Sequence, residues 1–485
     1  MGFCTWFFER RRKSNTSNNI ADPSTILVVW ASQNGFAREL AERTAAALTT
    51  AGRSASLLPL DQLNRRTIEK AARILFVAST TGEGSSPDHA LGFIRDTMAK
   101  PVDLNHLHYS VLALGNREYG NFCAFGHRID NWLRDHGALS LFDLIEVDDI
   151  DADAIRSWQY HVNRLAEIKD QADWLPMTYQ NWRLVERRCL NPGSLGNPVF
   201  HIALRPGGVS LPDWQAGDIL EVSPRHAGKT VADYLTRHGM DGEVLVDIDG
   251  HEVRLSEILS RSHLPSESEL PAQLKPQTLA GLLHPLPHRE YSIASLPDDG
   301  SLWLLVRWMP YPDGRPGLGS GWLCEHAPLD GDIAVRVRSN PNFHAPDPDK
   351  PMILIGNGTG IASLRSLLKA RIAAGSRNNW LVFGERQSER DFFYQEEIET
   401  WQAQGWLMRL DLAFSRDTDE KRYVQHPLQE AGPTLQEWVK QNASLYVCGS
   451  LEGMAPAVDA VLDSLLGIPV KERLLAERRY RRDVY

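Results

Sequence analysis

The sequence predicts an α/β protein of several domains: a doubly wound parallel sheet, an antiparallel β-barrel with a short helical insertion, and a second α/β domain. Its 485 residues suggest about three domains at roughly 150 residues each. Strand-like and helix-like runs alternate in the first and last thirds, which is typical of parallel sheets covered by helices. The middle third has short β-rich runs separated by turn residues, which favours an antiparallel barrel.

Composition narrows the class of protein. The chain is 42% apolar and 24% charged with a net charge of −10, which indicates a globular protein rather than a disordered one. The acidic balance argues against general nucleic-acid binding, which needs clustered Lys and Arg. No apolar run reaches the roughly 20 residues that span a membrane. The five cysteines are scattered, without metal-site or redox-motif spacing. We therefore expect that the protein binds no metal and resides in the reducing cytoplasm.

Residues 1–23 are expected to be a leader and linker. The aromatic segment Met1–Phe8 precedes the basic run Arg10–Lys13, which is the reverse of the order in a signal peptide. A disordered leader is the favoured interpretation. The alternative is a weak interfacial anchor, or the cytoplasmic end of a membrane helix, which would associate the protein with a membrane.

The first domain is expected over residues 24–168. Its predicted strands are Ile26–Trp30, Ala55–Leu58, Ile74–Ala78, Ser110–Leu114 and Leu141–Val147, and its predicted helices are Ala37–Thr50, Asp88–Met98, Phe122–His136 and Asp151–Ile168. Ligands of such sheets lie at the carboxyl ends of the strands, near the point where the strand order reverses. The loops that follow the first, third and fourth strands are therefore the expected ligand-binding loops.

These three loops combine glycines with hydroxyl, amide and aromatic side chains. The first opens a helix, where hydroxyls, amides and the helix dipole suit a phosphate. Glycines in the other two let the backbone approach a planar ligand, and Tyr119 can stack on it. The loops resemble those of the flavodoxins, which implies FMN, with its phosphate on the first loop and its isoalloxazine ring between the other two. The implied FMN residues are Ser32, Gln33, Asn34, Gly35, Phe36 and Ala37; Ser79, Thr80, Thr81, Gly82 and Gly84; and Gly115, Asn116 and Tyr119.

A linker, 169–181, precedes the barrel domain, which is expected over 182–345 with an insertion at 229–283. Its predicted strands are Val185–Cys189, Val199–Leu204, Ile219–Val222, Tyr291–Ser295, Leu302–Trp308 and Ile333–Val337. Arg289 precedes the aromatic Tyr291 and the hydroxyl of Ser292, and a glycine-rich run, Gly317–Leu323, follows some 28 residues later. An arginine can pair with a pyrophosphate, and glycines beside a serine supply further donors to it.

This pair of motifs resembles the FAD site of the ferredoxin–NADP reductase superfamily. The resemblance implies FAD contacts from Arg289, Tyr291, Ser292, Gly317, Gly319, Ser320 and the terminal Tyr485.

The last domain is expected over 346–485. An apolar strand, Met352–Ile355, precedes a glycine-rich turn with Gly358, Thr359 and Gly360, and a helix follows. Such a turn lets a dinucleotide pyrophosphate reach the helix N-terminus. Ser415, Arg416 and Lys421 follow a later strand that lacks a terminal acid, so this end suits the 2′-phosphate of NADPH rather than the ribose hydroxyl of NADH. The remaining expected NADP residues are Tyr423, Gln425 and Met454.

Cys448 ends the next strand, where the superfamily keeps a cysteine near the nicotinamide. The resemblance implies that Ser292, Cys448 and Asp483 surround the hydride transfer, with Tyr485 stacked on the flavin. The superfamily commonly has Pro where Asn357 and Ser363 stand, and Asp where Ser450 stands.

Flavodoxin, FAD and NADP modules in this order resemble the diflavin reductases over about residues 25–485. The ending Arg479–Tyr485 is similar to that of the flavoprotein component of NADPH sulfite reductase. The resemblance implies an NADPH-dependent reductase that passes electrons through FAD and FMN to a separate haem or iron–sulfur protein, most simply the haem component of sulfite reductase. The short insertion leaves open a membrane-bound, ferric or haem acceptor. An alternative of another class is a non-catalytic electron carrier that lacks FMN.

Overall fold

The computed structural model describes residues 24–485 apart from 168–178, 209–210, 249, 272–273 and 287. The predicted leader, residues 1–23, and most of the predicted linker at 169–181 lie outside the described residues. The described residues form two compact units, one built mainly from residues before 168 and one built mainly from residues after 178. No helix among the described residues is long and apolar enough to cross a membrane.

The first unit is a parallel sheet in the order β2-β1-β3-β4-β5, with β6 also paired to β4. The strands are β1 (Ile26–Ala31), β2 (Ala55–Pro59), β3 (Arg73–Ser79), β4 (His108–Gly115), β5 (Leu139–Ser140) and β6 (Ile145–Asp148). The strand order reverses between β1 and β3, and because the strands are parallel the loops after β1, β3 and β4 all lie at the carboxyl end of the sheet. The doubly wound sheet is therefore confirmed.

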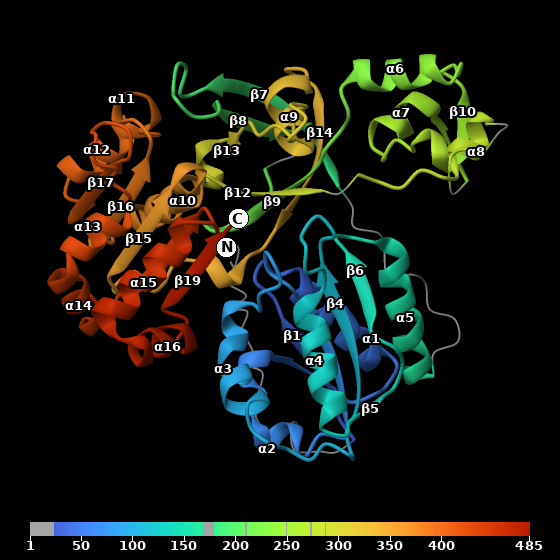
Figure 1. The fold of residues 1–485 in the computed structure, drawn as a ribbon, viewed down its shortest axis with the longest axis horizontal. Coiled ribbons are helices and arrows are strands. Elements are labelled where there is room, and N and C mark those ends of the chain that lie inside the picture. The colour runs from blue at the N-terminus through green and yellow to red at the C-terminus, as the bar shows by residue number, and fades with distance from the viewer. Residues whose placement is uncertain (1–23, 168–178, 209–210, 249, 272–273, 287) are drawn as a thin grey trace, which may run out of the picture. The chain divides into compact units, whose positions relative to one another are not determined.

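Helices cover both faces of this sheet (Figure 1). They are α1 (Phe36–Thr50), α2 (Arg65–Ile68), α3 (Leu91–Phe93), α4 (Ala124–Asp135) and α5 (Ala152–Ala166). The indole of the buried Trp158 in α5 donates to the Thr44 hydroxyl in α1, which joins these two helices. On the other face, Phe93, Phe125 and Trp132 pack into the main core cluster.

One predicted strand of this unit was wrong. Leu141–Val147 does not form a single strand, because only the short β5 and β6 pair with β4. The Phe142 ring between them stacks on His161, with centroids 4.4 Å apart, and its carbonyl accepts from Ser110 and Ser140. Packing of this ring against α5 thus interrupts the pairing.

The second unit begins with a six-stranded antiparallel sheet in the order β12-β9-β14-β7-β8-β13. Its strands are β7 (Gln180–Cys189), β8 (Val199–Pro206), β9 (Ile219–Ser223), β12 (Arg289–Ser292), β13 (Leu302–Arg307) and β14 (Asp332–Arg338), and the short helix α9 (Leu318–Gly321) follows β13. Alternate side chains of these strands enclose a core with Trp182, Trp214 and Trp322. The antiparallel architecture agrees with the sequence-based expectation.

The insertion has its own small core around Val231, Leu255 and Leu259. It contains α6 (Gly228–Arg237), α7 (Leu255–Ser260) and α8 (Pro276–Ala280), together with an antiparallel hairpin of β10 (Leu245–Ile248) and β11 (His251–Arg254). The helices agree with the helical insertion expected from the sequence, whereas the hairpin was not predicted.

A second parallel sheet, in the order β17-β16-β15-β18-β19, completes the unit (Figure 1). Its strands are β15 (Met352–Asn357), β16 (Asn379–Glu385), β17 (Arg409–Phe414), β18 (Ser444–Gly449) and β19 (Tyr480–Val484). The helices are α10 (Ile361–Ala373), α11 (Ser388–Asp391), α12 (Gln395–Ala403), α13 (Gln425–Glu430), α14 (Gly432–Lys440), α15 (Met454–Leu466) and α16 (Ile468–Ala476). The order reverses between β15 and β18, which places the glycine-rich turn after β15 at the expected ligand edge.

Candidate active site

Three of the predicted catalytic side chains meet at this edge. Cys448, in β18, pairs directly with Asp483 of β19. The Ser292 hydroxyl, at the end of β12 in the antiparallel sheet, donates to Asp483 Oδ2 at 2.8 Å, and the Cys448 Sγ lies 3.8 Å from the same oxygen. The site is therefore built by two different sheets, and Asp483 connects them.

Burial governs the ionisation of the Asp483 carboxyl group and the Cys448 thiol. Asp483 is 9% exposed, and burial raises the pKa of its carboxyl above the ordinary value, although hydrogen bonds from Ser292 and Cys448 oppose the shift. Burial, together with the neighbouring Asp483 charge, holds the pKa of the Cys448 thiol well above its usual value. The thiol is thus protonated near neutral pH, so any negative charge of this pair is carried by the Asp483 carboxyl group.

Tyr485 follows β19 and lies against the glycine-rich turn. Its backbone N–H donates to the Gly449 carbonyl at 3.0 Å, and its carbonyl accepts from Leu451. Its hydroxyl is 3.1 Å from Thr359 Oγ1. Tyr485 is 56% exposed as a residue, and its aromatic ring could pack on a planar ligand.

The predicted FAD residues form a close cradle. A methyl group built on Gly319 in α9 would lie 2.5 Å from the Tyr291 hydroxyl and 2.6 Å from Cγ of Arg289. The Gly317 N–H donates to the Met309 carbonyl at 2.7 Å. Ser320 Oγ accepts from the Met309 N–H at 3.1 Å and donates to the Met309 carbonyl at 3.2 Å. Only glycine allows the backbone this near to Arg289 and Tyr291, and the guanidinium group and the aromatic ring fit a flavin with a pyrophosphate.

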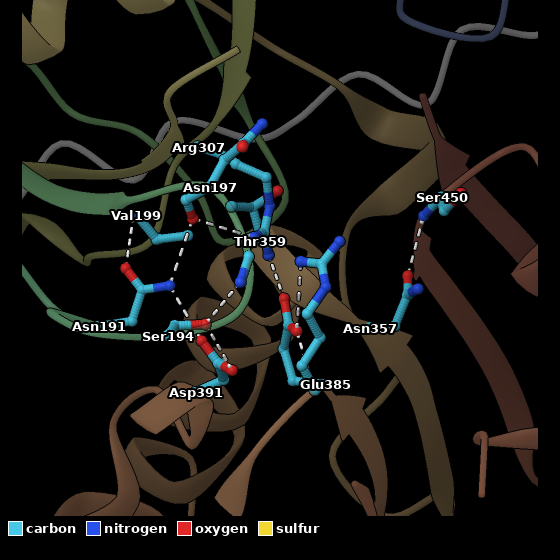
Figure 2. A network of polar contacts seen from close by, with 12 residues as sticks. Asn191, Ser194, Asn197, Val199, Arg307, Asn357, Thr359, Glu385, Asp391 and Ser450 are labelled. Atoms are coloured by element: carbon cyan, nitrogen blue, oxygen red, sulfur yellow. Dashed lines mark hydrogen bonds and ion pairs between the residues drawn. The ribbon is translucent and has the colours of Figure 1, made fainter. Parts of the chain in front are cut away.

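The glycine-rich turn packs tightly on β18. A methyl group on Gly360 would lie 2.2 Å from the Cys448 carbonyl oxygen, and one on Gly356 would lie 2.6 Å from it. Asn357 also joins the turn to β18, because its Oδ1 accepts from the Ser450 N–H at 2.9 Å (Figure 2). The turn is thus fixed beside the Cys448–Asp483 pair, at the N-terminus of α10, where a pyrophosphate fits.

The residues expected to read the 2′-phosphate follow β17. Ser415 is buried and its N–H donates to the Glu385 carbonyl, whereas Arg416, Lys421 and Tyr423 are exposed. Gln425 begins α13. Met454 begins α15 and is buried in the core cluster of this sheet, so it is not exposed beside the basic residues.

Two charged residues that the sequence analysis did not single out also reach the turn. Arg307, the last residue of β13, forms an ion pair with Glu385, the last residue of β16. A methyl group on Gly358 would lie 3.3 Å from Arg307 Nη2 and 3.5 Å from Glu385 Oε1. The two positions are 78 residues apart and carry no motif, so no local sequence signal could have paired them.

In the first unit, the loops after β3 and β4 come together at the carboxyl edge of the sheet. The Asn121 side chain donates to the Glu83 carbonyl at 2.8 Å, and a methyl group on Gly84 would lie 2.8 Å from Asn121 Cβ. Ser79 and Thr80 anchor these loops to β1 and α4 respectively. The buried Thr81 hydroxyl has no hydrogen-bond partner among the described residues, as expected of a group reserved for a ligand.

The remaining expected FMN residues occupy the same edge. Gly82 has a positive φ, and Gly115 ends β4 so close to Cys123 that a methyl group would lie 2.7 Å from the Cys123 nitrogen. Asn116 Oδ1 accepts from the Glu118 N–H, and Tyr119 is 44% exposed. Ser32, Gln33, Asn34 and Gly35 connect β1 to α1, which Phe36 and Ala37 begin. The three loops thus offer glycines, donors and a ring that fit a flavin mononucleotide.

One cluster of possible metal ligands occurs among the described residues: Glu221, His288 and Glu290, whose ligand atoms lie within 4.8 Å of one another. Arg336 and Arg338 both form ion pairs with Glu221, and Arg338 also pairs with Glu290. Two guanidinium groups already neutralise the carboxylates, so the cluster is an ion-pair network.

Comparison with known families agrees with these two units. Residues 28–158 match the flavodoxin family, and residues 354–460 match the oxidoreductase NAD-binding domain family. The fold and the matches define a flavin-dependent oxidoreductase of the ferredoxin–NADP reductase type that carries an additional flavodoxin-like domain.

Curated relatives specify the family further. The sulfite reductase [NADPH] flavoprotein alpha-component of Yersinia enterocolitica is 30% identical over 95% of this chain and 90% of its own length. The corresponding protein of Vibrio parahaemolyticus is 30% identical over 95% of this chain and 86% of its own length. That of Neisseria meningitidis serogroup A is 29% identical over 96% of this chain and 90% of its own length. The chain belongs to the family of these flavoproteins, the diflavin reductases. It is an NADPH-dependent flavoprotein oxidoreductase, and its cofactors are FMN, FAD and NADPH.

Proposed function

We propose that this reductase supplies electrons from NADPH to the haem component of a sulfite reductase. The observation that supports the reductase chemistry is the Ser292–Asp483 hydrogen bond, because it joins the predicted flavin strand to the predicted nicotinamide site. The partner is inferred from the relatives, which are flavoprotein alpha-components of sulfite reductase. When bound, FAD takes a hydride from NADPH and FMN releases electrons singly, which suits a haem acceptor.

The antiparallel sheet would hold FAD. Arg289 and Ser320, with the backbone around Gly317 and Gly319, would bind its pyrophosphate, and Tyr291 would pack on the ring system. Ser292 would then present its hydroxyl to the ring nitrogen that takes part in the transfer. Tyr485 would cover the opposite face until the nicotinamide replaces it.

Asp483 and Cys448 would act on the nicotinamide. The Asp483 carboxylate is fixed by Ser292, so it can stabilise the positive charge that develops on the nicotinamide ring as the hydride leaves. The buried, protonated Cys448 thiol adds no second charge and would serve as a small packing surface for the ring. This division of roles requires Asp483 to be ionised.

The rest of NADPH would lie along the same sheet edge. Gly358, Thr359 and Gly360 would bind the pyrophosphate, and Arg307, beside Gly358, would neutralise part of its charge. Ser415, Arg416 and Lys421 would bind the 2′-phosphate, while Tyr423 and Gln425 would contact the adenosine end. Met454 would act only indirectly, by supporting β18 from the core.

The flavodoxin-like unit would hold FMN, with its phosphate at Ser32–Ala37. The ring would lie between the loop Ser79–Gly84 and the loop of Gly115, Asn116 and Tyr119. We propose domain limits of 24–168 for this module, 182–345 for the FAD module with its insertion at 229–283, and 346–485 for the NADP module. Because β7 begins at Gln180, the FAD module would begin two residues earlier than the sequence predicts.

Reconstitution tests the partner. The purified flavoprotein, mixed with a purified haem component of NADPH sulfite reductase, should support NADPH-dependent reduction of sulfite to sulfide. NADPH-dependent reduction of ferricyanide by the flavoprotein alone is the control for the intact reductase. If ferricyanide is reduced and sulfite is not, the partner assignment is wrong and the reductase function stands.

A further inference from the structure

Glu385 is a buried carboxylate at the place where the phosphates of NADPH are expected. It ends β16, next to the end of β15, and its side chain is 5% exposed. Its Oε1 lies 3.5 Å from a methyl group built on Gly358. An anion at this edge opposes the binding of a second anion, so its presence requires an explanation.

Arg307 is the nearest countercharge of Glu385, whose Oε2 also lies 4.0 Å from Nη1 of Arg386. The two side chains form an ion pair, and Arg307 Nη1 also donates to the Asn197 carbonyl at 3.3 Å (Figure 2). Glu385 Oε2 accepts from the Arg386 N–H at 2.6 Å. The Glu385 carboxylate is therefore paired with Arg307, the cation that a bound pyrophosphate would also contact.

The position of Arg307 does not depend on Glu385 alone. Asp391 is fully buried and accepts from the side chains of Asn191 and Ser194, at 2.9 and 3.0 Å. Asn191 donates in turn to the Asn197 carbonyl, the second acceptor of Arg307 (Figure 2). This network holds the Asn197 carbonyl in place, so Arg307 retains an anchor when the charge on Glu385 is removed.

We propose that Glu385 sets the affinity for the nicotinamide dinucleotide by competing with its pyrophosphate for Arg307. The inference rests on the proposed function, in which the glycine-rich turn binds that pyrophosphate. Both NADPH and NADP⁺ carry the group, so the carboxylate weakens both. Weaker binding of NADP⁺ speeds release of the product, and product release limits turnover in many enzymes. Glu385 is thus a positioning residue that trades affinity for release.

The test is Glu385→Gln in the flavin-loaded enzyme, since glutamine keeps the shape and the acceptor oxygen but removes the charge. Calorimetric dissociation constants for NADP⁺ and NAD⁺ should both fall about tenfold, because like charges brought together cost a kcal/mol or more. The constant for 2′,5′-ADP, which has no pyrophosphate, should change less. In turnover, KM for NADPH should fall and kcat should not rise.

Glu397→Gln is the matched control, because Glu397 forms an ion pair with the buried Arg365 and lies on another element, α12. It should leave the dissociation constants unchanged. If the Glu385→Gln variant does not fold, Glu385→Asn, which also removes the charge, is measured instead.

Unchanged or weaker NADP⁺ binding in the Glu385 variant would overturn the proposal and make the ion pair a structural element. Arg307→Gln separates this result from a failure of the proposed function. If Arg307→Gln weakens NADP⁺ and NAD⁺ alike but the Glu385 variant does not tighten them, only the role of Glu385 is wrong. If neither variant changes binding, the pyrophosphate lies elsewhere and the proposed nucleotide site is wrong too.

Discussion

The Tyr485 hydroxyl lies 3.1 Å from Oγ1 of Thr359, so the aromatic ring expected over the flavin is hydrogen-bonded to the turn expected to bind the pyrophosphate. A nucleotide that forms a hydrogen bond with the Thr359 hydroxyl would replace the hydrogen bond between Thr359 and Tyr485. The pyrophosphate end and the flavin end of the proposed nucleotide site are thereby linked through the Thr359 hydroxyl.

Replacing Tyr485 should change the preference between nucleotides. An aromatic stack contributes about 0.5–1.5 kcal/mol, so in Tyr485→Ala the NADPH-to-NADH ratio of kcat/KM should fall by about two- to tenfold. NADPH can displace the ring with the help of its 2′-phosphate contacts, whereas NADH cannot. Tyr485→Phe keeps the ring and should retain most of the preference. The measurement is ferricyanide reduction with both nucleotides, and a constant ratio in Tyr485→Ala would show that the ring does not gate the site.

Arg416→Ala should raise KM for NADPH about ten- to hundredfold, because a charge-assisted hydrogen bond to the 2′-phosphate is lost. Turnover of NADH, which has no such phosphate, should be nearly unchanged. Arg422→Ala is the control on the same segment, since Arg422 is already paired with Glu430. Equal losses with NADPH and NADH in Arg416→Ala would rule out a role in reading the phosphate.

Asp483 predicts a pH dependence. Burial raises its pKa above the ordinary value, so the carboxylate is lost as the pH falls through that raised pKa. The rate of flavin reduction by NADPH should therefore fall on the acid side, at a higher pH than an exposed aspartate would give. Asp483→Asn should lower the rate about ten- to hundredfold and abolish this acid limb. An acid limb that persists in Asp483→Asn belongs to another group.

The same shift has an opposite effect on stability. The folded protein binds a proton at Asp483 more tightly than the unfolded chain does, so ionisation of this group costs folding free energy once the pH exceeds the ordinary aspartate pKa. At neutral pH, Asp483→Asn should therefore raise the free energy of unfolding while it lowers activity. Urea denaturation of both proteins at pH 7 measures the difference, and a less stable Asp483→Asn protein would contradict the expectation.

The purified protein should contain one FMN and one FAD per chain, measured by chromatography of the flavins released by acid. In Gly319→Ala the added methyl group would collide with Tyr291 and Arg289, so FAD should be lost and FMN retained. Gly228→Ala, where a methyl group meets nothing within 4 Å, is the control. FAD without FMN in the unaltered protein would mean that the loop Ser32–Ala37 does not bind a phosphate.

Sequence patterns predicted the sheets where hydrophobic runs dominate and failed where distant contacts decide the structure. The strands β1, β3 and β4 are buried apolar runs, and their predicted ends lie within about two residues of the observed ones. The strand β19 was missed because Tyr480–Val484 has the sequence YRRDV, a polar pattern that becomes a strand only by pairing with β18. The meeting of Ser292 with Asp483 was expected from family resemblance, since 191 residues separate them and no local pattern joins them.

The contacts around Asp391 bear on how this protein can be divided and recombined. Asn191 and Ser194 of the antiparallel module satisfy a carboxylate of the nucleotide module, and the buried Arg365 of α10 donates back to the Ala294 carbonyl. A cut between the two modules would remove these partners from two buried charged groups of the nucleotide module, Asp391 and Arg365, at a cost of about several kcal/mol. The antiparallel module and the nucleotide module would therefore have to be inherited together in a gene fusion.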